Sequence, residues 1–430
     1  MSTSRLPRVV TVVGLDDTDS RVEGMCTTYA AARLAESIRE AGGTVERLLL
    51  VRLNPAVEHK TRGNAALAVH TDLDTDRATG LVGDVLDMAR TGDPKTNPGA
   101  IVADCGPDEV PPQVAEFTMD TIRTIQDPTT ATLLADTVGF ARCERGDGRG
   151  LVGALAAVGA WAALSEWTYE HIAYRERDRW GTDREVEAER VRAAADDHYP
   201  TVWDTIDRES GYPVCVPRTP CPILYGIRGD DPGACRAVSE AITGEPVDTS
   251  ATFVTNQGTD VHLQDATPET VADDSAARVT GTVVEAPETR EGGHVFLTLG
   301  ADGSRLQCAA FEPTKRFRDH VRALREGDRI TACGEVSDGT LKLEKFAVRE
   351  LVRTEPATPT CPDCGATMSS AGRGQGYRCR DCATSADGKV ARELTRTLEV
   401  GWYEVPPVAR RHIATPLVRG GFDAPTHPER

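Results

Sequence analysis

The chain has 430 residues, which predicts more than one domain, because a single hydrophobic core stops growing well below this length. Hydrophobic residues make up 39% and charged residues 27%, and this composition excludes an intrinsically disordered chain. The net charge of −18 at first argues against a nucleic-acid partner. However, only six of the 49 basic residues are Lys. An acidic, Lys-poor surface is expected in a salt-rich cytoplasm, the setting of a halophile, so local basic patches are more informative about partners than net charge.

The sequence predicts a cytoplasmic protein with no membrane partner. The longest weakly polar run, Gly150 to Leu164, falls short of the roughly 18–20 apolar residues of a membrane span and reads as a buried helix. Carboxylates follow the apolar run Val9–Leu15 directly, where a signal peptide has a small-residue cleavage site. In a reducing cytosol, the twelve cysteines are expected to be metal ligands or small hydrophobic residues.

Strands and helices alternate in the first part of the chain. Its first element, Val9–Leu15, is a continuous apolar run, which is typical of a buried parallel strand. The elements predicted after it are helix Thr27–Ala41, strands Arg47–Leu53 and Ala65–His70, helix Thr79–Arg90, strand Ala100–Ala103, and helices Pro111–Ile125 and Leu151–Ala160. This layout predicts an α/β domain over residues 1–164.

Residues 165–265 show a βαββαβ order, the pattern of a ferredoxin-like domain. Its predicted elements are strand Thr168–Arg175, helix Arg184–Asp196, strands Val202–Asp207 and Ile223–Arg228, helix Pro232–Ile242 and strand Thr252–Thr255.

Residues 277–352 contain five β-rich runs, with a helix over Lys315–Arg325 between the third and the fourth. This is the order of an OB-fold β-barrel. Polar segments at Asp265–Ser275 and Thr354–Thr360 are predicted to be linkers on either side of it. The fold class is therefore α/β and α+β multidomain.

Two Cys-x-x-Cys pairs lie in the last predicted unit, residues 358–420. Zinc takes four ligands in a tetrahedron, and each pair supplies two thiolates from one tight turn. Two disulfides are the alternative, but the sequence shows no secretory context. We therefore predict a zinc ribbon with a structural Zn²⁺ held by Cys361, Cys364, Cys379 and Cys382.

Arginine and aromatic residues surround the ribbon and continue into the tail. Such a mixture suits phosphates and stacked bases, although a solvated face with core aromatics explains any single residue equally well. The candidates for RNA binding are Arg373, Arg378, Arg380, Trp402, Arg410, Arg411 and His412.

An acidic loop, Asp16-Asp17-Thr18-Asp19-Ser20, directly follows the first predicted strand. Ligands collect at the carboxyl ends of strands in open α/β sheets. Clustered carboxylates repel one another unless a cation joins them, and Mg²⁺ is commonly held by carboxylates together with substrate phosphates. The alternative, an acidic turn that caps a helix, is less consistent with a position directly after a buried strand.

Two further segments are predicted to bind phosphate. The first runs from His59 to Asn64 and contains one of the few lysines, a point charge suited to phosphate. The second is a glycine-rich loop that leads into a helix, where backbone N–H groups can bind phosphate. The candidates are Lys60, Thr61, Arg62, Asn64, Gly146, Gly148 and Gly150, joined by Ser20 and Thr27 near the acidic loop.

Taken together, the sequence resembles the archaeal 2-agmatinylcytidine synthetases, the agmatine-transferring enzymes of the minor isoleucine tRNA. The resemblance rests on GLDDTDS with GMCTTY, VRLNPAVEHKTRGN, GDGRGLVGALAAVGA, TYEHIAYR, LYGIRG, TNQGTDVHL, CPDC with CRDC, and YEVPPVARRH. These motifs follow in order from Gly14 to His412, so nearly the whole chain is covered.

The resemblance implies a kinase-like ATP-binding domain, followed by the ferredoxin-like domain, the OB-fold and the ribbon. It implies a ligase that uses ATP, releases AMP and phosphates, and attaches agmatine to C2 of the wobble cytidine, which switches decoding from AUG to AUA. By the same resemblance Thr18 is transiently phosphorylated. The catalytic set is then Asp16, Asp17, Thr18, Asp19, Lys60 and Arg62.

Agmatine carries a guanidinium, which needs a carboxylate partner, and Asp104 and Asp260 are the candidates. Two other readings stay open at this point. One is a non-catalytic RNA-binding protein built on the OB-fold and the ribbon, and the other is a related ATP-dependent RNA-modifying enzyme that uses a different amine.

Overall fold

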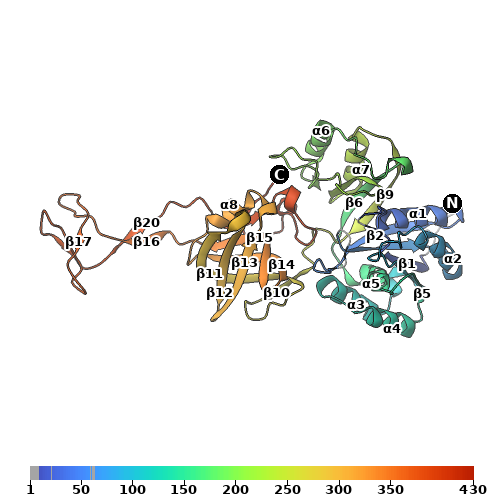
Figure 1. Cartoon of the computed structure of the whole chain (residues 1–430), viewed down its shortest axis with the longest axis horizontal. Helices are drawn as coiled ribbons and strands as arrows, with labels where there is room; N and C mark the ends of the chain where they lie inside the picture. The colour runs from blue at the N-terminus through green and yellow to red at the C-terminus, as the bar shows by residue number, and fades with distance from the viewer. Residues whose placement is uncertain (1–8, 21, 59, 61–62) are drawn as a thin grey trace, which may run out of the picture.

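The computed structural model describes residues 9–20, 22–58, 60 and 63–430. Three parts follow one another along its long axis (Figure 1). A large α/β part lies at one end, a β-barrel lies in the middle, and a small cysteine-containing part lies at the far end of a thin two-stranded arm. The chain is therefore a mixed α/β multidomain protein, as its length and element order predict.

The α/β part is built on one nine-stranded sheet with the order β5-β4-β1-β3-β2-β9-β6-β8-β7. Its strands are β1 (Thr11–Asp16), β2 (Val45–Arg52), β3 (Ala65–Thr71), β4 (Gly99–Ala103), β5 (Ala141–Glu144), β6 (Thr168–Arg175), β7 (Val202–Trp203), β8 (Ile223–Gly229) and β9 (Val247–Thr255).

The first strand is buried as predicted, but it is not a parallel strand. β1 pairs antiparallel with both neighbours, β3 and β4, and among the named pairs of this sheet only β2 and β9 run parallel. An apolar run reports that both faces of a strand are covered, and it carries no information about the direction of the neighbouring strands. Here helices cover both faces, which explains the misleading pattern.

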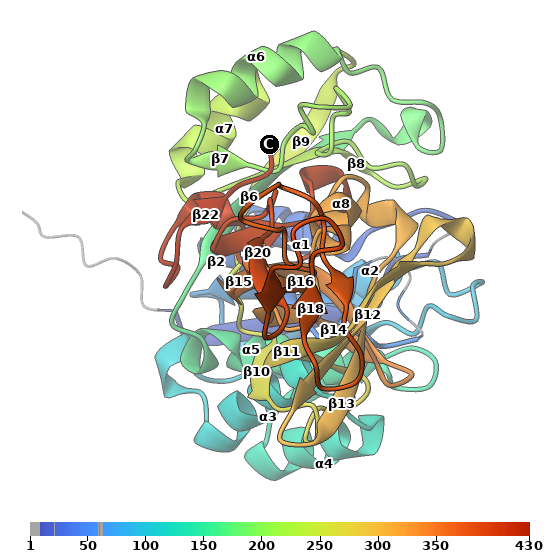
Figure 2. The same cartoon turned by 90° about the vertical axis from the view of Figure 1, so that its left-hand side faces the viewer.

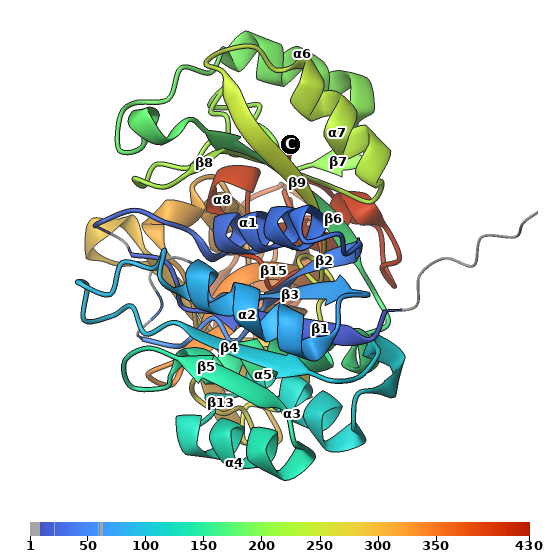
Figure 3. The same ribbon diagram turned by 90° about the vertical axis from the view of Figure 1, so that its right-hand side faces the viewer.

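The helices of this part are α1 (Thr27–Glu40), α2 (Thr75–Leu86), α3 (Pro112–Arg123), α4 (Pro128–Val138), α5 (Gly150–Ala163), α6 (Ala188–His198) and α7 (Pro232–Ala241). One hydrophobic core joins α1 and α2 to one face of the sheet, and α3, α4 and α5 form a second core on the other face. Figure 3 shows α1 and α2 lying across the near face. α6 and α7 pack on β6, β7 and β8.

In the α/β part, one helix and one strand were not expected from the sequence, α4 and β5. Both ends of α4 nevertheless carry ordinary signals, because the Asp127 side chain accepts the Thr129 N–H at 2.7 Å and Gly139 ends the helix with a φ of 76°. α2 begins earlier than predicted because Asp74 caps it, accepting the Arg77 N–H at 3.0 Å.

The predicted βαββαβ order is present between β6 and β9. These strands lie in the order β9-β6-β8-β7, and every neighbouring pair is antiparallel. β7 is much shorter than the strand predicted over Val202–Asp207. Since β9 also pairs with β2, the two α/β segments share one continuous sheet.

The barrel closes through the pairs β11–β12, β12–β13, β13–β15, β15–β14 and β14–β11. The elements are β10 (Leu263–Ala266), β11 (Ser275–Thr289), β12 (Val295–Ala301), β13 (Ser304–Ala310), α8 (Phe317–Arg322), β14 (Arg329–Ser337) and β15 (Thr340–Glu350). α8 lies between the third and fourth barrel strands, where a helix was predicted. The expected linker at Asp265–Ser275 is partly strand, since β10 pairs parallel with β11.

The arm consists of β16 (Thr354–Ala357) and β20 (Val390–Glu393), and it carries β17 (Ser369–Ser370), β18 (Tyr377–Arg378) and β19 (Ser385–Ala386) at its end. Figure 2 looks along the arm. The chain then returns to the barrel sheet through β21 (Gly401–Glu404) and β22 (Thr426–His427), so the predicted tail packs on the barrel and not on the ribbon. None of the described helices has the length and apolar character to cross a membrane.

Candidate active site

Glycines let α5 pack directly against the strands that carry the acidic loop. A Cβ on Gly14 would overlap the Ala154 carbonyl oxygen, and a Cβ on Gly99 would overlap the backbone of Gly150. One turn further along α5, a Cβ on Gly153 would overlap the Asp16 carboxylate. The small-residue sequence of this helix therefore has a defined purpose, because it brings the helix backbone against the first catalytic candidate.

The acidic loop has a constrained geometry. Asp17 has a φ of 56°, its N–H donates to Asp16 Oδ1 at 2.7 Å, and its own Oδ2 accepts the Asn97 N–H at 2.9 Å. The Asp19 carbonyl accepts from Thr96 Oγ1 at 2.8 Å. These bonds present several carboxylates to one cavity in a backbone conformation that non-glycine residues rarely adopt.

The carboxylates of this loop are held in an unfavourable environment. Burial, followed by the charge of Asp17, raises the pKa of Asp16 well above its usual range. Burial raises the pKa of Asp17 to about 7 against the lowering effect of the Asn97 N–H, and the charge of Asp19 adds to the increase. Such a cluster is stabilised by a cation.

We expect Asp17→Asn to raise the stability of the metal-free protein at pH 8. The pKa of Asp17 lies near 7 in the folded chain and near 3.8 when unfolded, so the folded state binds the proton more tightly. The free energy of unfolding therefore falls as the pH rises from about 4 to 7. Asn cannot ionise, so the free energy of unfolding at pH 8 should rise by about 2 kcal/mol. A difference of about three pKa units corresponds to about twice this value, and we halve it because the loop borders solvent.

The measurement is a thermal melt in EDTA at pH 5 and pH 8. Asp147→Asn is the matched control of opposite sign. Burial alone would raise the pKa of Asp147, but the hydrogen bonds and charge of Arg149 lower it below its ordinary value. The ionised form of Asp147 therefore stabilises the folded state above about pH 4. Equal melting temperatures for Asp17→Asn and the unchanged protein at pH 8 would contradict the expectation.

A cavity of about 530 Å³ opens beside the loop. Its polar side contains three of the predicted carboxylates together with Lys60 and Asn64. Its other side is more apolar and comes from the end of β2 and from the turn between α3 and α4. The lining residues of that side include Leu53, Val57, Thr121, Thr124, Ile125, Gln126, Pro128 and Val152.

Thr18, Ser20 and Thr27 lie behind the cavity surface. Thr18 is fully buried, and its hydroxyl donates to Thr27 Oγ1 at 3.1 Å, at the first residue of α1. Ser20 donates to Asp93 Oδ2 at 2.6 Å and accepts the Glu23 N–H, so its hydroxyl closes a turn. None of these three is among the described residues that line the cavity.

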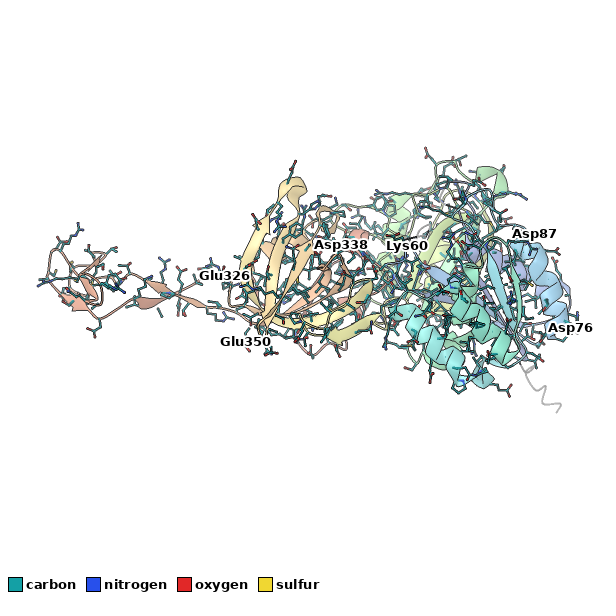
Figure 4. All side chains as sticks on the ribbon, turned by 60° about the horizontal axis from the view of Figure 1, so that its bottom comes forward. Lys60, Asp76, Asp87, Glu326, Asp338 and Glu350 are labelled. Carbon is teal, nitrogen blue, oxygen red and sulfur yellow. The ribbon has the colours of Figure 1, made fainter. Side chains whose placement is uncertain are left out.

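The predicted phosphate loop reaches the cavity through Lys60, Gly63 and Asn64. Lys60 donates to the Pro55 carbonyl and lies where the α/β part meets the barrel (Figure 4). Asn64 Nδ2 donates to the Asn54 carbonyl at 2.9 Å. Thr61 and Arg62, which the sequence also singled out, lie outside the described residues.

The glycine-rich loop contributes through its neighbours and not through its glycines. Gly146 and Gly148 have φ values of 84° and 82°, which only glycine adopts without strain, and Gly150 packs on Gly99. The described residues of this loop that reach the cavity are Asp147 and Arg149, whose side chains pair at 2.9 Å.

Sequence reasoning missed Asn97, which ties the two loops together. Its N–H binds Asp17, its Oδ1 accepts the Asp147 N–H at 3.2 Å, and its carbonyl accepts the Gly150 N–H at 3.1 Å. The only signal in the sequence is an Asn before a Pro, which predicts a turn and nothing about its partners.

The cavity lining of the described chain includes neither agmatine candidate. Asp104 is exposed and accepts from Thr75 Oγ1 at 3.0 Å. It follows β4, which runs antiparallel to β1, so it lies at the opposite end of these strands from the acidic loop. Asp260 accepts twice from Lys345 Nζ at 2.8 Å and once from Arg278, so it joins the α/β part to the barrel.

The four predicted metal ligands lie together. The Sγ atoms of Cys361, Cys364, Cys379 and Cys382 are all within 4.8 Å of one another. Tetrahedral zinc with Zn–S bonds of about 2.3 Å requires sulfurs about 3.8 Å apart, and Cys364 and Cys379 are 3.6 Å apart. Positive φ values at Gly365 and Ala383, one residue after each pair, form the two tight turns.

The RNA-binding candidates separate into two groups. Arg373, Arg378 and Arg380 are exposed on the ribbon. The tail residues are engaged within the protein, because Trp402 is buried and donates to Asp423, and Arg410 pairs with Asp204 and Glu404. The other two tail candidates make their contacts with the protein as well, Arg411 with Glu335 and Glu344, and His412 against Gly63.

Three family models match parts of the chain. Residues 12–86 match the TiaS TCKD domain, residues 148–262 the TiaS FLD domain, and residues 358–398 the TiaS C-terminal zinc ribbon domain. Similar solved structures include a complex of TiaS with an isoleucine tRNA and ATP, with a TM-score of 0.89 and 39% identity over 98% of this chain and 100% of the other. A complex of TiaS with an isoleucine tRNA, AMPCPP and agmatine has a TM-score of 0.86 and 37% identity over the same shares.

Relatives along nearly the whole chain point the same way. The isoleucine-tRNA 2-agmatinylcytidine synthetase TiaS of Haloquadratum walsbyi is 53% identical over 98% of this chain and 100% of its own length. That of Methanosarcina mazei is 44% identical, over 95% and 97%. With an acidic cavity, a four-cysteine ribbon and this similarity from end to end, the chain belongs to the family of isoleucine-tRNA 2-agmatinylcytidine synthetases, TiaS.

Proposed function

We propose that this protein is an ATP-dependent ligase that attaches agmatine to C2 of the wobble cytidine of the minor isoleucine tRNA. The observation that carries the proposal is the similarity over 98% of the chain to a relative solved with an isoleucine tRNA, AMPCPP and agmatine. The cavity beside the acidic loop is the place where these substrates meet. The modified isoleucine tRNA reads AUA instead of AUG. The enzyme works in the cytoplasm, where tRNA is used.

The residues of the acidic loop fit a magnesium ion. Asp16, Asp17 and Asp19 offer carboxylate oxygens, the donors that Mg²⁺ prefers. The pKa values of the first two are raised, chiefly by burial and then by neighbouring carboxylates, and a bound cation would offset both effects. When bound, Mg²⁺ neutralises the charge of the ATP phosphates. We assign the three carboxylates to this ion.

The cationic side chains complete the phosphate site. Lys60 lines the cavity, and Arg149 lies beside Asp147 and Asp17. Cations directed at the transferring phosphoryl group stabilise its transition state. Arg62 belongs to the same predicted set. Phosphorylation makes the cytidine O2 a better leaving group, so that the amine of agmatine can attack C2.

Thr18 is proposed as the transient phosphate carrier, on the strength of family resemblance. Its hydroxyl is buried and donates to Thr27 Oγ1, so the acidic loop has to shift before Thr18 can receive a phosphoryl group. The strained φ of the preceding residue, Asp17, fits a loop with more than one conformation.

We propose the finer architecture as follows. Residues 1–164 form the kinase-like ATP-binding domain, and residues 165–265 form a ferredoxin-like domain, supported by the antiparallel order β9-β6-β8-β7. Residues 277–352 form an OB-fold, supported by the closed barrel with α8 after its third strand. Residues 358–420 comprise the ribbon with its structural Zn²⁺ and the tail that returns to the barrel.

The ribbon depends on its metal. We expect Cys379→Ser to unfold the ribbon and to leave the rest of the protein folded. Its own core consists of two of the cysteines and Met368 with a few partly buried neighbours, which is too little to fold without zinc. Elemental analysis should find one zinc per chain before the substitution and none after it. The main thermal transition should stay in place, while proteolysis should cut the arm. A wild-type chain without zinc, with four freely titratable ribbon thiols, would contradict this expectation.

The activity is tested by mixing the protein with ATP, Mg²⁺, agmatine and the minor isoleucine tRNA. AMP release and a mass gain on the tRNA equal to one agmatine less one water are expected. Binding of the tRNA without either product would favour the non-catalytic RNA-binding protein.

The same assay with putrescine or lysine in place of agmatine shows which amine the enzyme uses. We expect product with agmatine only, and a larger yield with another amine would favour the related RNA-modifying enzyme.

A further inference from the structure

The wall of the cavity is supported from outside the α/β part by His412. A Cβ on Gly63 would lie 3.3 Å from His412 Cδ2, 3.6 Å from its Nε2 and 2.9 Å from Arg52 Nη1. Gly63 itself lines the cavity, between Lys60 and Asn64. The histidine ring and the guanidinium therefore lie against Gly63, a residue that also lines the cavity.

Arg52 is a rigid support. Its Nε donates to Gln257 Oε1 at 3.0 Å and its Nη2 to Glu170 Oε2 at 3.4 Å. Its backbone N–H donates to Asn256 Oδ1 at 2.7 Å. Glu170 is held in turn by Arg228 at 3.3 Å. Burial lowers the pKa of Arg52 to about 10, so the side chain stays charged at neutral pH.

His412 is held equally firmly by the segment that carries it. Its carbonyl accepts the Gly258 N–H at 3.3 Å. Two residues before it, Arg410 pairs with Asp204 at 2.8 Å, and three residues after it, the Thr415 N–H donates to Asp260 Oδ1 at 2.5 Å. Burial and the charges of Arg52 and Arg228 lower the pKa of His412 well below its usual range, so its ring is neutral near pH 7.

The exit of the loop is fixed by a separate set of bonds. Asn64 accepts the Leu53 N–H at 3.0 Å and donates to the Asn54 carbonyl at 2.9 Å. Asn54 donates to the Asp274 carbonyl at 2.8 Å, at the entry to the barrel. Gly63 is a described position of the loop that the tail, which follows the barrel in sequence, contacts directly.

We propose that His412 is a positioning residue, which together with Arg52 holds Gly63 and so places the neighbouring Lys60 at the cavity wall. The inference rests on the proposed function, because Lys60 acts there on phosphate. His412 follows β21, a strand of the barrel sheet. The packing of the tail on the barrel is thereby coupled to the shape of the active site.

The first test compares His412→Ala with His427→Ala. His427 is a second tail histidine, stacked on Tyr403 at 4.4 Å within the barrel sheet, and it serves as the matched control. We expect His412→Ala to lower kcat by about ten-fold or more with the KM for tRNA changed less than about two-fold, since a small misplacement of a catalytic group is costly. His427→Ala should keep kcat. A raised KM for tRNA with unchanged kcat would overturn the proposal and make His412 an RNA contact.

A double-mutant cycle isolates the contact itself. Gly63→Ala introduces a methyl group against His412 and Arg52, and should also lower kcat. The doubly substituted protein should lose less than the product of the two single losses, because His412→Ala removes one of the two side chains that the methyl group meets. Multiplicative losses would refute the contact.

Hydrogen exchange without substrates gives an independent readout. Peptides that cover residues 53–65 should exchange faster in His412→Ala than in His427→Ala, and equal rates would count against the proposal. Failure of the proposed function is recognised separately, because the unsubstituted protein would then form no product while the difference in exchange would persist.

Discussion

Gly153→Ala is expected to lower product formation by about a hundred-fold while tRNA binding is retained. The added Cβ would overlap Asp16 Oδ2, and both positions are held by regular structure, α5 on one side and β1 on the other. The carboxylate has to turn away from the cavity, and misplacement by about an ångström costs a rate of this order. The free energy of unfolding should fall by about 1–3 kcal/mol, the usual cost of overpacking.

Gly80→Ala is the matched control for this substitution. Gly80 also lies inside a helix, α2, but a Cβ there meets no atom within 4 Å. Replacing it should stabilise the protein by about 0.5–1 kcal/mol and leave product formation unchanged. AMP release and tRNA mass report activity, and a filter-binding titration reports tRNA affinity. Wild-type rates for Gly153→Ala would show that the Asp16 carboxylate has no defined position in the reaction.

Asp16→Ala is expected to reduce ATP-dependent product formation by about a thousand-fold or more. Asp16 is more deeply buried than Asp17, and its loss removes one of the assigned magnesium ligands from the place where phosphate charge has to be neutralised. The metal-free protein should not be destabilised, because the substitution removes a buried charge and its repulsion from Asp17.

Asp76→Ala provides the comparison. Asp76 is exposed in the first turn of α2 and lies far from Lys60 (Figure 4). Its replacement should cost less than about 1 kcal/mol of stability and no activity. If Asp16→Ala abolishes tRNA binding together with product formation, the acidic loop supports the fold and not the chemistry.

Local patterns predicted the parts of this protein whose structure depends on neighbours in sequence. The four cysteines were found because each pair of ligands comes from one tight turn. The order of helices and strands followed from periodicity and end signals, and the acidic loop was recognised because its carboxylates are adjacent. Most of the fold and the polar half of the cavity were therefore accessible without a structure.

The contact partners of these residues could not be predicted from the sequence. Contact partners depend on strand direction and on which surfaces of the fold pack together. An apolar strand has the same sequence pattern whether its neighbours are parallel or antiparallel. The antiparallel direction of β4 places Asp104 at the opposite end of the strands from Asp16. Asn97 joins the acidic loop to the glycine-rich loop only because the fold brings the two loops together. The apolar wall from the turn between α3 and α4 likewise reaches the cavity only in the folded chain.

The arginines and aromatics of the tail show the same division. Composition alone makes Arg410, Arg411 and Trp402 look like an RNA-binding surface, yet the folded chain engages them with Glu404, Glu335 and Asp423. The sequence by itself determined most of the helices and strands of the α/β part and the barrel, the four-cysteine cluster and the acidic loop. Only the tertiary structure decided which charged side chains face the cavity and which neutralise one another, because contacts between residues far apart in sequence depend on packing that no local pattern records.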